Sequence, residues 1–261
     1  MADMLDGNFL NILKDLKSQQ GVYQEGQTLF TEDRRTSFPI IMDIPIFLKD
    51  GDVTGENAKY QKFYDKVGRF TGSVFWFFCR LFQLDMVSKR KELLSDLQVK
   101  PGQKVLETSI GAGANIPPLT KEAEYIGVDI SMGMLRACQK YSLIKPYNLQ
   151  LVHANAEELP FKDETFDVVF HFGGINFFND IPKAINEMIR VAKPGAQILI
   201  GDETQEHVDS WYSKLPIIKK YFKEVEGVSP PTNMIPSHME NLKLGYKWDN
   251  SMYVITFNKP K

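Results

Sequence analysis

The chain has 261 residues, of which 43% are hydrophobic and 25% are charged, and its formal net charge is -2. This composition is typical of a globular protein that can form one core plus an accessory segment. The balanced charge gives no general attraction to phosphate backbones, so nucleic-acid binding is not indicated. The only cysteines, Cys79 and Cys138, are too few for a zinc or iron–sulfur site, so we expect reduced thiols and no metal.

The first sixteen residues contain acids and lack the basic segment and apolar run of a signal or transit peptide. We therefore expect a cytoplasmic protein. Between Gly21 and Asp50, short apolar stretches alternate with turn residues, which predicts short strands. Because no cysteine precedes Cys79, apolar contacts instead of zinc must hold this region together. The residues expected to make them are Phe38, Ile40, Ile41, Ile44, Ile46 and Phe47.

We expect residues 1–58 to form a metal-free accessory subdomain that packs on the rest of the chain, since no low-complexity linker separates the two. Two roles remain open for this subdomain. It either covers one edge of the main sheet, or it selects a substrate or docks a partner.

The segment from Val67 to Gln83 predicts a helix that is apolar over most of its circumference. It is shorter than the roughly 20 apolar residues that span a bilayer, and it contains Arg69 and Arg80. Three interpretations remain open: a helix buried in the core and lid, an aromatic wall for a lipophilic acceptor, and a peripheral membrane contact.

A nucleotide cradle is predicted further along the chain. Residues Lys104 to Glu107 form a short apolar strand after a Pro-Gly turn, and small residues follow from Ser109 to Ala114. Such small residues permit a tight turn and close approach of a ligand. A second strand, Tyr125 to Val128, ends at Asp129, close to the separation at which a Rossmann unit presents a carboxylate to ribose hydroxyls.

The glycine pattern of this loop does not favour a dinucleotide enzyme. A GxGxxG register that starts at Ser109 lacks its first glycine, and one that starts at Gly111 has Ile116 in third place. The chain also contains no segment typical of a second dinucleotide half. These departures make NAD a poor candidate ligand.

Two downstream segments, Leu151 to Phe170 and Ala184 to Glu203, contain LPF, FDVV and RVAKPG in this order. With the cradle, they resemble the class I S-adenosylmethionine-dependent methyltransferases over roughly Tyr60 to Lys261. Three segments make the chain most similar to the branch that includes the ubiquinone and menaquinone biosynthesis C-methyltransferases: FYDK, Phe63 to Lys66, the LPF segment, and the FGGINFFND loop, Phe172 to Asp180. That branch includes enzymes with very different acceptors, so the resemblance predicts a cofactor and a reaction better than a substrate.

The resemblance implies an α/β, Rossmann-like, doubly wound fold for residues 59–261, with a seven-stranded, mostly parallel sheet. An antiparallel pair near Leu242 to Trp248 and Met252 to Asn258, joined by a turn at residues 249–251, should close it.

The same resemblance implies a cofactor, S-adenosyl-L-methionine, and residues to hold it. Glu107 and the backbone from Ser109 to Gly113 should hold the methionine moiety, Asp129 the ribose, and Asn155 with Ala156 the adenine. The predicted cofactor-binding residues are Tyr64, Glu107, Ser109, Gly111, Gly113, Asp129, Ile130, Met134, Asn155, Ala156, Phe172 and Gly173. The family more often has an acid at the position of Asn155, so here an amide oxygen would accept the adenine amino hydrogen.

Two residues are predicted to take part in catalysis. His171 ends the fourth strand of the fold, and its ordinary pKa of about 6.5 suits proton removal, although a structural role is the alternative. Tyr64 should lie near the methionine end of the cofactor. Glu203, after the fifth strand, either orients an acceptor or lies in the first turn of the next helix.

The expected reaction is methyl transfer to a small apolar or aromatic acceptor, by in-line displacement. Two alternatives remain. One is a cofactor-binding regulatory or scaffold protein without turnover, which the departures at Ser109 and Asn155 permit. The other is RNA methylation, favoured only because Phe38 to Leu48 resembles the tail of zinc-ribbon modules that precede some ribosomal RNA methyltransferases.

Overall fold

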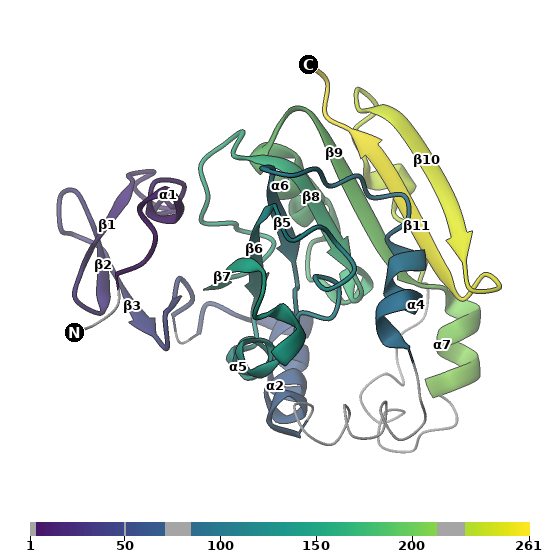
Figure 1. The fold of residues 1–261 in the computed structure, drawn as a ribbon, viewed down its shortest axis with the longest axis horizontal. Helices are drawn as coiled ribbons and strands as arrows, with labels where there is room; N and C mark the ends of the chain where they lie inside the picture. The colour runs from purple at the N-terminus through teal and green to yellow at the C-terminus, as the bar shows by residue number, and fades with distance from the viewer. Residues whose placement is uncertain (1–3, 50, 71–84, 213–227) are drawn as a thin grey trace.

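The computed structural model describes residues 4–49, 51–70, 85–212 and 228–261 (Figure 1). Its central element is a seven-stranded sheet in the order β10-β11-β9-β8-β5-β6-β7. The strands are β5 (Lys104–Thr108), β6 (Glu124–Asp129), β7 (Asn148–His153), β8 (Phe166–Phe172), β9 (Ala192–Glu203), β10 (Glu240–Lys247) and β11 (Met252–Asn258). Strands β5 to β9 pair in parallel, whereas β11 runs antiparallel to both β9 and β10.

This topology confirms the predicted α/β fold class, including the antiparallel pair and its turn. The turn from Trp248 to Asn250 has three successive residues with positive φ, of 52°, 50° and 64°. Asp and Asn tolerate this left-handed region better than other non-glycine residues, which explains why the chain reverses direction here.

Helices cover both faces of the sheet. They are α2 (Gly55–Phe70), α4 (Met86–Leu93), α5 (Met132–Lys140), α6 (Ile181–Val191) and α7 (Gln205–Tyr212). Buried side chains alternate between the two faces: along β8, Val169 joins the core beneath α6, whereas Val168 and Phe170 join the core beneath α4 and α5. The sequences of the parallel strands are therefore almost continuously apolar, as expected for strands that are buried on both faces.

The amino-terminal residues form a smaller sheet beside β7 (Figure 1). After a short helix, α1 (Gly7–Leu10), the strands β1 (Val22–Glu25), β2 (Thr28–Thr31), β3 (Ser37–Ile41) and β4 (Ile44–Pro45) pair antiparallel in chain order. Ile46 forms a parallel bridge with His153, and the Phe47 N–H donates to the His153 carbonyl at 2.9 Å. The smaller sheet thus adjoins the β7 edge of the larger one.

Two predictions made from the sequence stay untested by the fold. The expected boundary between residues 58 and 59 falls inside α2, and whether residues 1–58 fold as a unit remains a prediction. The apolar helix expected from Val67 to Gln83 lies outside the described residues from position 71 onward. None of the helices in the described ranges is both long and apolar enough to cross a membrane.

Candidate active site

A cavity of about 370 Å³ opens at the carboxyl ends of β5, β6, β8 and β9. Ligands of open α/β sheets collect at this edge, because the strand order reverses there and leaves a crevice. Residues of α2 and α4 complete the walls. The cavity therefore combines parts of the chain that lie more than 100 residues apart.

The loop after β5 has three residues in the left-handed region: Ser109 with φ 59°, Gly111 with φ 55° and Gly113 with φ 78°. A Cβ on Gly111 would lie 3.3 Å from the Met134 methyl carbon, and one on Gly113 would lie 2.7 Å from the sulfur of Cys138. Gly111 lines the cavity, whereas Gly113 packs on α5 behind it. The loop departs from the usual pattern at Ser109, where a side chain occupies a conformation that favours glycine.

Asp129 ends β6 and lies in the cavity wall. Its carboxylate accepts hydrogen bonds from the Gly111 N–H and the Ser131 N–H, each at 2.8 Å. Burial raises the pKa of Asp129 to about 6, although these hydrogen bonds favour the ionised form. One carboxylate thus ties the β5 loop to the start of α5, and its remaining lone pairs are available to a ligand.

A relay of three polar side chains lies behind the β5 loop. The Arg90 guanidinium, on α4, donates to the Asn115 amide oxygen at 3.1 Å, and the Asn115 amide nitrogen donates to Glu107 at 2.6 Å. The second oxygen of Glu107 and the Nε of Arg90 are buried and have no hydrogen-bond partner among the residues that the structure describes. Burial raises the pKa of Glu107 to about 8, while Asn115 and Arg90 oppose this shift. Arg90 lines the cavity, and Glu107 lies directly behind its lining.

Helix α2 covers the cavity and contributes Asn57, Tyr60 and Tyr64 to its lining. Asn179 accepts from the Glu56 N–H at 2.9 Å at the start of the helix, and Gln61 donates to the Ile130 carbonyl at 2.7 Å.

Asp65 makes the corresponding contacts near the other end of α2. It accepts from the Ser131 hydroxyl at 2.7 Å and the Gly133 N–H at 2.9 Å. Such bonds anchor α2 to the loops that follow β6 and β8.

Aromatic side chains line the part of the cavity near β8 and β9. Tyr60 stacks on Phe177 with ring centroids 4.5 Å apart, and Phe172 and Phe178 lie in the same wall. Burial, and then the charges of Asp202 and Glu203, raise the pKa of the Tyr64 hydroxyl above its ordinary range. Tyr64 therefore remains protonated and can donate a hydrogen bond.

Asp202 organises the loop that follows β8. Its carboxylate accepts from the Gly174 N–H at 3.0 Å and from the Asn176 amide at 2.9 Å, and Asn176 also contacts the Tyr253 hydroxyl at 3.0 Å. Asp202 itself is buried at the end of β9. These bonds fix the backbone of Gly173 and Gly174, which the cavity lining includes.

His171, predicted as a general base, does not line this cavity. It is fully buried, its Nδ1 lies 3.1 Å from the Thr108 hydroxyl, and its ring contacts Phe178 edge-on. Burial lowers its pKa to about 4, against the effect of the Asp202 charge. Side chains alternate along a strand, so His171 points away from the wall that contains Phe172.

Asn155 and Ala156 also lie outside this cavity. The Asn155 amide oxygen accepts from the Glu157 N–H at 3.0 Å, which closes a tight turn after β7. Asn155 borders a different cavity, at the junction with the amino-terminal sheet, and Ala156 is buried.

The structure thus brings eight of the predicted residues to one cavity. They are Tyr64, Ser109, Gly111, Asp129, Ile130, Met134, Phe172 and Gly173. Glu107 lies directly behind the lining, and Gly113, Asn155, Ala156 and His171 do not contribute to it. Sequence reasoning missed Arg90, Asn57 and Tyr60, which belong to no recognised motif, although FYDK pointed to Tyr64 on the same helix as Asn57 and Tyr60.

Known proteins resemble this chain in sequence over part of its length. Residues 106–200 match the family described as "Methyltransferase domain". A protein named demethylmenaquinone methyltransferase from Lysinibacillus sphaericus is 31% identical over 143 residues, which cover 53% of this chain and 60% of that protein. One of the same name from Listeria monocytogenes is 31% identical over 144 residues, with the same coverage. The matched region spans about 60% of the length of these relatives.

Solved structures share the fold. A structure described as an S-adenosylmethionine-dependent methyltransferase from Thermotoga maritima has a TM-score of 0.55 at 19% identity, covering 78% of this chain and all of that one. Another, from Methanococcus maripaludis, has a TM-score of 0.56 at 17% identity and covers 82% of this chain and 98% of that one. Both structures are described as S-adenosylmethionine-dependent methyltransferases, and at these identities they show a shared fold.

The cavity fits S-adenosylmethionine. The unpartnered Glu107 oxygen and Arg90 Nε suit the ammonium and carboxylate of a methionine moiety, and Asp129 offers lone pairs to ribose hydroxyls. The tight β5 loop, which a Cβ at Gly111 would crowd, permits close approach of a ligand. Residues 106–200 are therefore similar to a methyltransferase domain, and the chain shares the fold of solved structures described as S-adenosylmethionine-dependent methyltransferases.

Proposed function

We propose that the chain transfers a methyl group from S-adenosylmethionine to a small aromatic or apolar acceptor, within the cavity beneath α2. When bound, the cofactor supplies a methyl group that its sulfonium already activates, so the protein need only position, desolvate and, where necessary, deprotonate the acceptor. One observation carries the proposal: a single cavity joins the β5 loop and Asp129 to an aromatic wall.

Each end of the cavity has groups suited to one part of the cofactor. Asp129 would accept from the ribose hydroxyls, and the relay from Glu107 to Arg90 would hold the charged methionine end. The protonated Tyr64 hydroxyl, near Asp202 and Glu203, would donate a hydrogen bond toward the methionine end.

The acceptor would lie between α2 and the loop after β8. Tyr60, Phe177 and Phe178 offer flat apolar faces there, and aromatic pairs favour stacked or edge-on packing of a ring. Relatives named demethylmenaquinone methyltransferase support a ring-containing acceptor of quinone type. Helix α2 would exclude water from the reacting atoms.

Where the acceptor must release a proton, Glu203 is the better placed base. It lines the cavity and lies 3.8 Å from His207, whereas His171 is sealed behind the aromatic wall. Because its charged form is disfavoured by burial, His171 acts instead as a neutral packing and hydrogen-bonding residue beside Thr108.

An acceptor screen tests the proposal. The chain is incubated with methyl-labelled S-adenosylmethionine and reduced naphthoquinones, phenols, amines, thiols or RNA, and labelled product is measured. We expect label in quinols or phenols. Cofactor binding without transfer to any acceptor would favour a scaffold protein, and transfer to RNA alone would contradict a small acceptor.

A further inference from the structure

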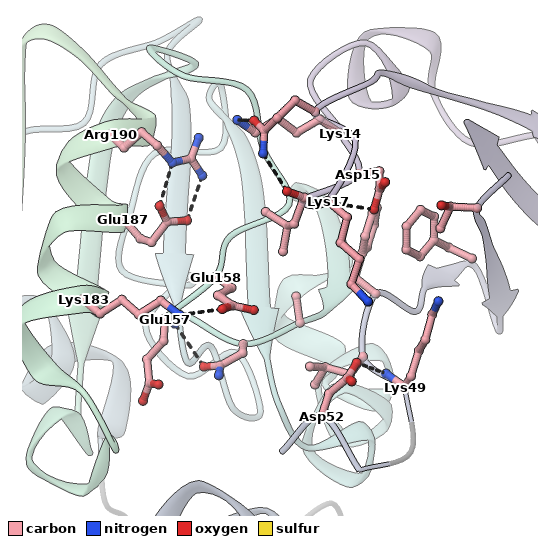
Figure 2. Close-up of a pocket in the computed structure, with 18 residues that line it drawn as sticks. Lys14, Asp15, Lys17, Lys49, Asp52, Glu157, Glu158, Lys183, Glu187 and Arg190 are labelled. Atoms are coloured by element: carbon pink, nitrogen blue, oxygen red, sulfur yellow. Dashed lines mark hydrogen bonds and ion pairs between the residues drawn. The ribbon is translucent and has the colours of Figure 1, made fainter. Parts of the chain in front are cut away.

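A second cavity, of about 670 Å³, lies between the amino-terminal sheet and the core (Figure 2). Residues 14–17, 19, 36, 38, 47–49 and 52 supply one wall, and the turn after β7 and the polar face of α6 supply the other. This size falls within the range of roughly 300–1,000 Å³ that is typical of small-molecule sites. None of its lining residues belongs to the cavity beneath α2.

The acidic side chains of this cavity already have donors. Glu187 pairs with Arg190 through two bonds of 2.7 and 2.8 Å, and Glu158 pairs with Lys183. Glu157 accepts from the amide of Asn57 on α2 at 2.8 Å. The carboxylates of Asp15 and Asp52 accept from the main chain of their own turns.

Two of the cationic side chains that line this cavity form neither a hydrogen bond nor an ion pair with the residues that the structure describes. Lys183 and Arg190 have the partners just given, and Lys14 contacts Gln19 at 2.7 Å. Among the residues that the structure describes, the ammonium groups of Lys17 and Lys49 form no hydrogen bond or ion pair. Figure 2 shows both side chains on the wall formed by the amino-terminal segment.

Asp15 lines the same cavity, and the charge of Lys49 acts on its carboxylate. Burial opposes ionisation of Asp15, but hydrogen bonds from Ser18 and the Lys17 N–H, together with the Lys49 charge, hold its pKa below the ordinary value. Its lone pairs are therefore occupied by its own turn. An anion that contacts both ammonium groups would interact favourably with each of them.

Further donors face the same cavity from both walls. The Asn155 amide nitrogen and the Thr36 hydroxyl make no hydrogen bond within the described part of the chain. Lysine ammonium groups and amide N–H groups together suit the oxygens of a phosphate group. Beneath them, Phe38 and Phe47 pack with ring centroids 4.4 Å apart and give the cavity an apolar floor.

We propose that this junction cavity binds a phosphorylated small molecule, with its phosphate between Lys17 and Lys49 and its apolar part on Phe38 and Phe47. The site does not depend on methyl transfer. It joins the amino-terminal segment to Asn155, at the turn after β7, so that the bound molecule would contact both parts of the chain.

Calorimetric titration of the full chain tests this site with three probes: inorganic phosphate, pyrophosphate and phenyl phosphate. We expect saturable binding of at least one, and tighter binding of phenyl phosphate than of phosphate if the aromatic floor contributes. Exchanging both lysines for glutamine, Lys17→Gln with Lys49→Gln, should weaken binding at least about tenfold, because each removes a charged hydrogen bond.

A matched variant, Lys121→Gln with Lys145→Gln, makes the same charge change at exposed positions outside the cavity and should leave binding within about twofold. Thermal unfolding checks that both variants fold. The proposal is overturned if no probe binds the unaltered chain, or if both double variants weaken binding equally.

Discussion

Replacing Asp129 by alanine should weaken binding of the cofactor product, S-adenosylhomocysteine, without unfolding the chain. Asp129 accepts two backbone hydrogen bonds of 2.8 Å, and we assign its remaining lone pairs to the ribose hydroxyls. A hydrogen bond to a charged group contributes about 1.5–3 kcal/mol, and loop relaxation recovers part of it. We therefore expect a loss of about 1–3 kcal/mol in binding free energy, or roughly 5- to 150-fold in Kd.

Isothermal titration calorimetry measures this loss, with Asp167→Ala as the matched control. Asp167 also accepts a backbone hydrogen bond, from Lys104 at 2.9 Å, but it lies at the amino end of β8, away from the cavity. The control should bind as the unaltered chain does. If Asp129→Ala binds within about twofold of the unaltered chain, or loses no more than the control, the assignment of Asp129 to the ribose is refuted.

Four further outcomes are expected. Glu107 has a pKa of about 8 when folded against an ordinary 4.5, so the folded chain holds a proton that the unfolded chain releases. The free energy of unfolding without cofactor should therefore fall as pH rises from about 4.5 to about 8, and Glu107→Gln should flatten this dependence in urea titrations; an unchanged slope would contradict it. Arg90→Met should weaken S-adenosylhomocysteine binding about tenfold or more, since a charged hydrogen bond is lost. Arg90→Lys should recover part of the lost affinity, and equal binding by the two variants would contradict this prediction. Ser109→Gly should raise the free energy of unfolding by up to about 1 kcal/mol, because serine is strained at φ 59°, and a lower value would show that the serine side chain stabilises the loop. Asn179→Ala should cost about 1 kcal/mol and speed amide exchange at the start of α2, whose N–H groups it caps; exchange that stays as slow as in the unaltered chain would show that the cap is dispensable.

The strands and the cradle were predictable because their signals are local. Apolar runs predicted β5 and β6, and small residues predicted the turn between Glu107 and Asn115, where the structure has residues with positive φ. Asp129 was found by spacing alone, and it lies in the cavity wall as expected. The Asp-Asn pair at the β10–β11 turn was also a local signal.

The remaining parts of the site depend on tertiary packing. The cavity includes Arg90, Asn57 and Tyr60 because α2 and α4 pack over the edge of the sheet. The apolar periodicity of a helix does not predict which part of the sheet the helix packs against. His171 is the next-to-last residue of β8, near the edge of the sheet where the cavity opens. Side chains alternate along the strand, so His171 is buried in the core, whereas Phe172 faces the cavity. The Asn155 amide oxygen accepts a hydrogen bond from the Glu157 N–H within a turn. Such a local role is common for asparagine and competes with binding of a ligand.

The central claim is that the cavity beneath α2 binds S-adenosylmethionine. Calorimetric titration of the full chain with S-adenosylmethionine, and separately with NAD, tests it most directly. The account predicts one saturable site for S-adenosylmethionine, competition by S-adenosylhomocysteine, and no binding of NAD. Binding of NAD without binding of S-adenosylmethionine would contradict it.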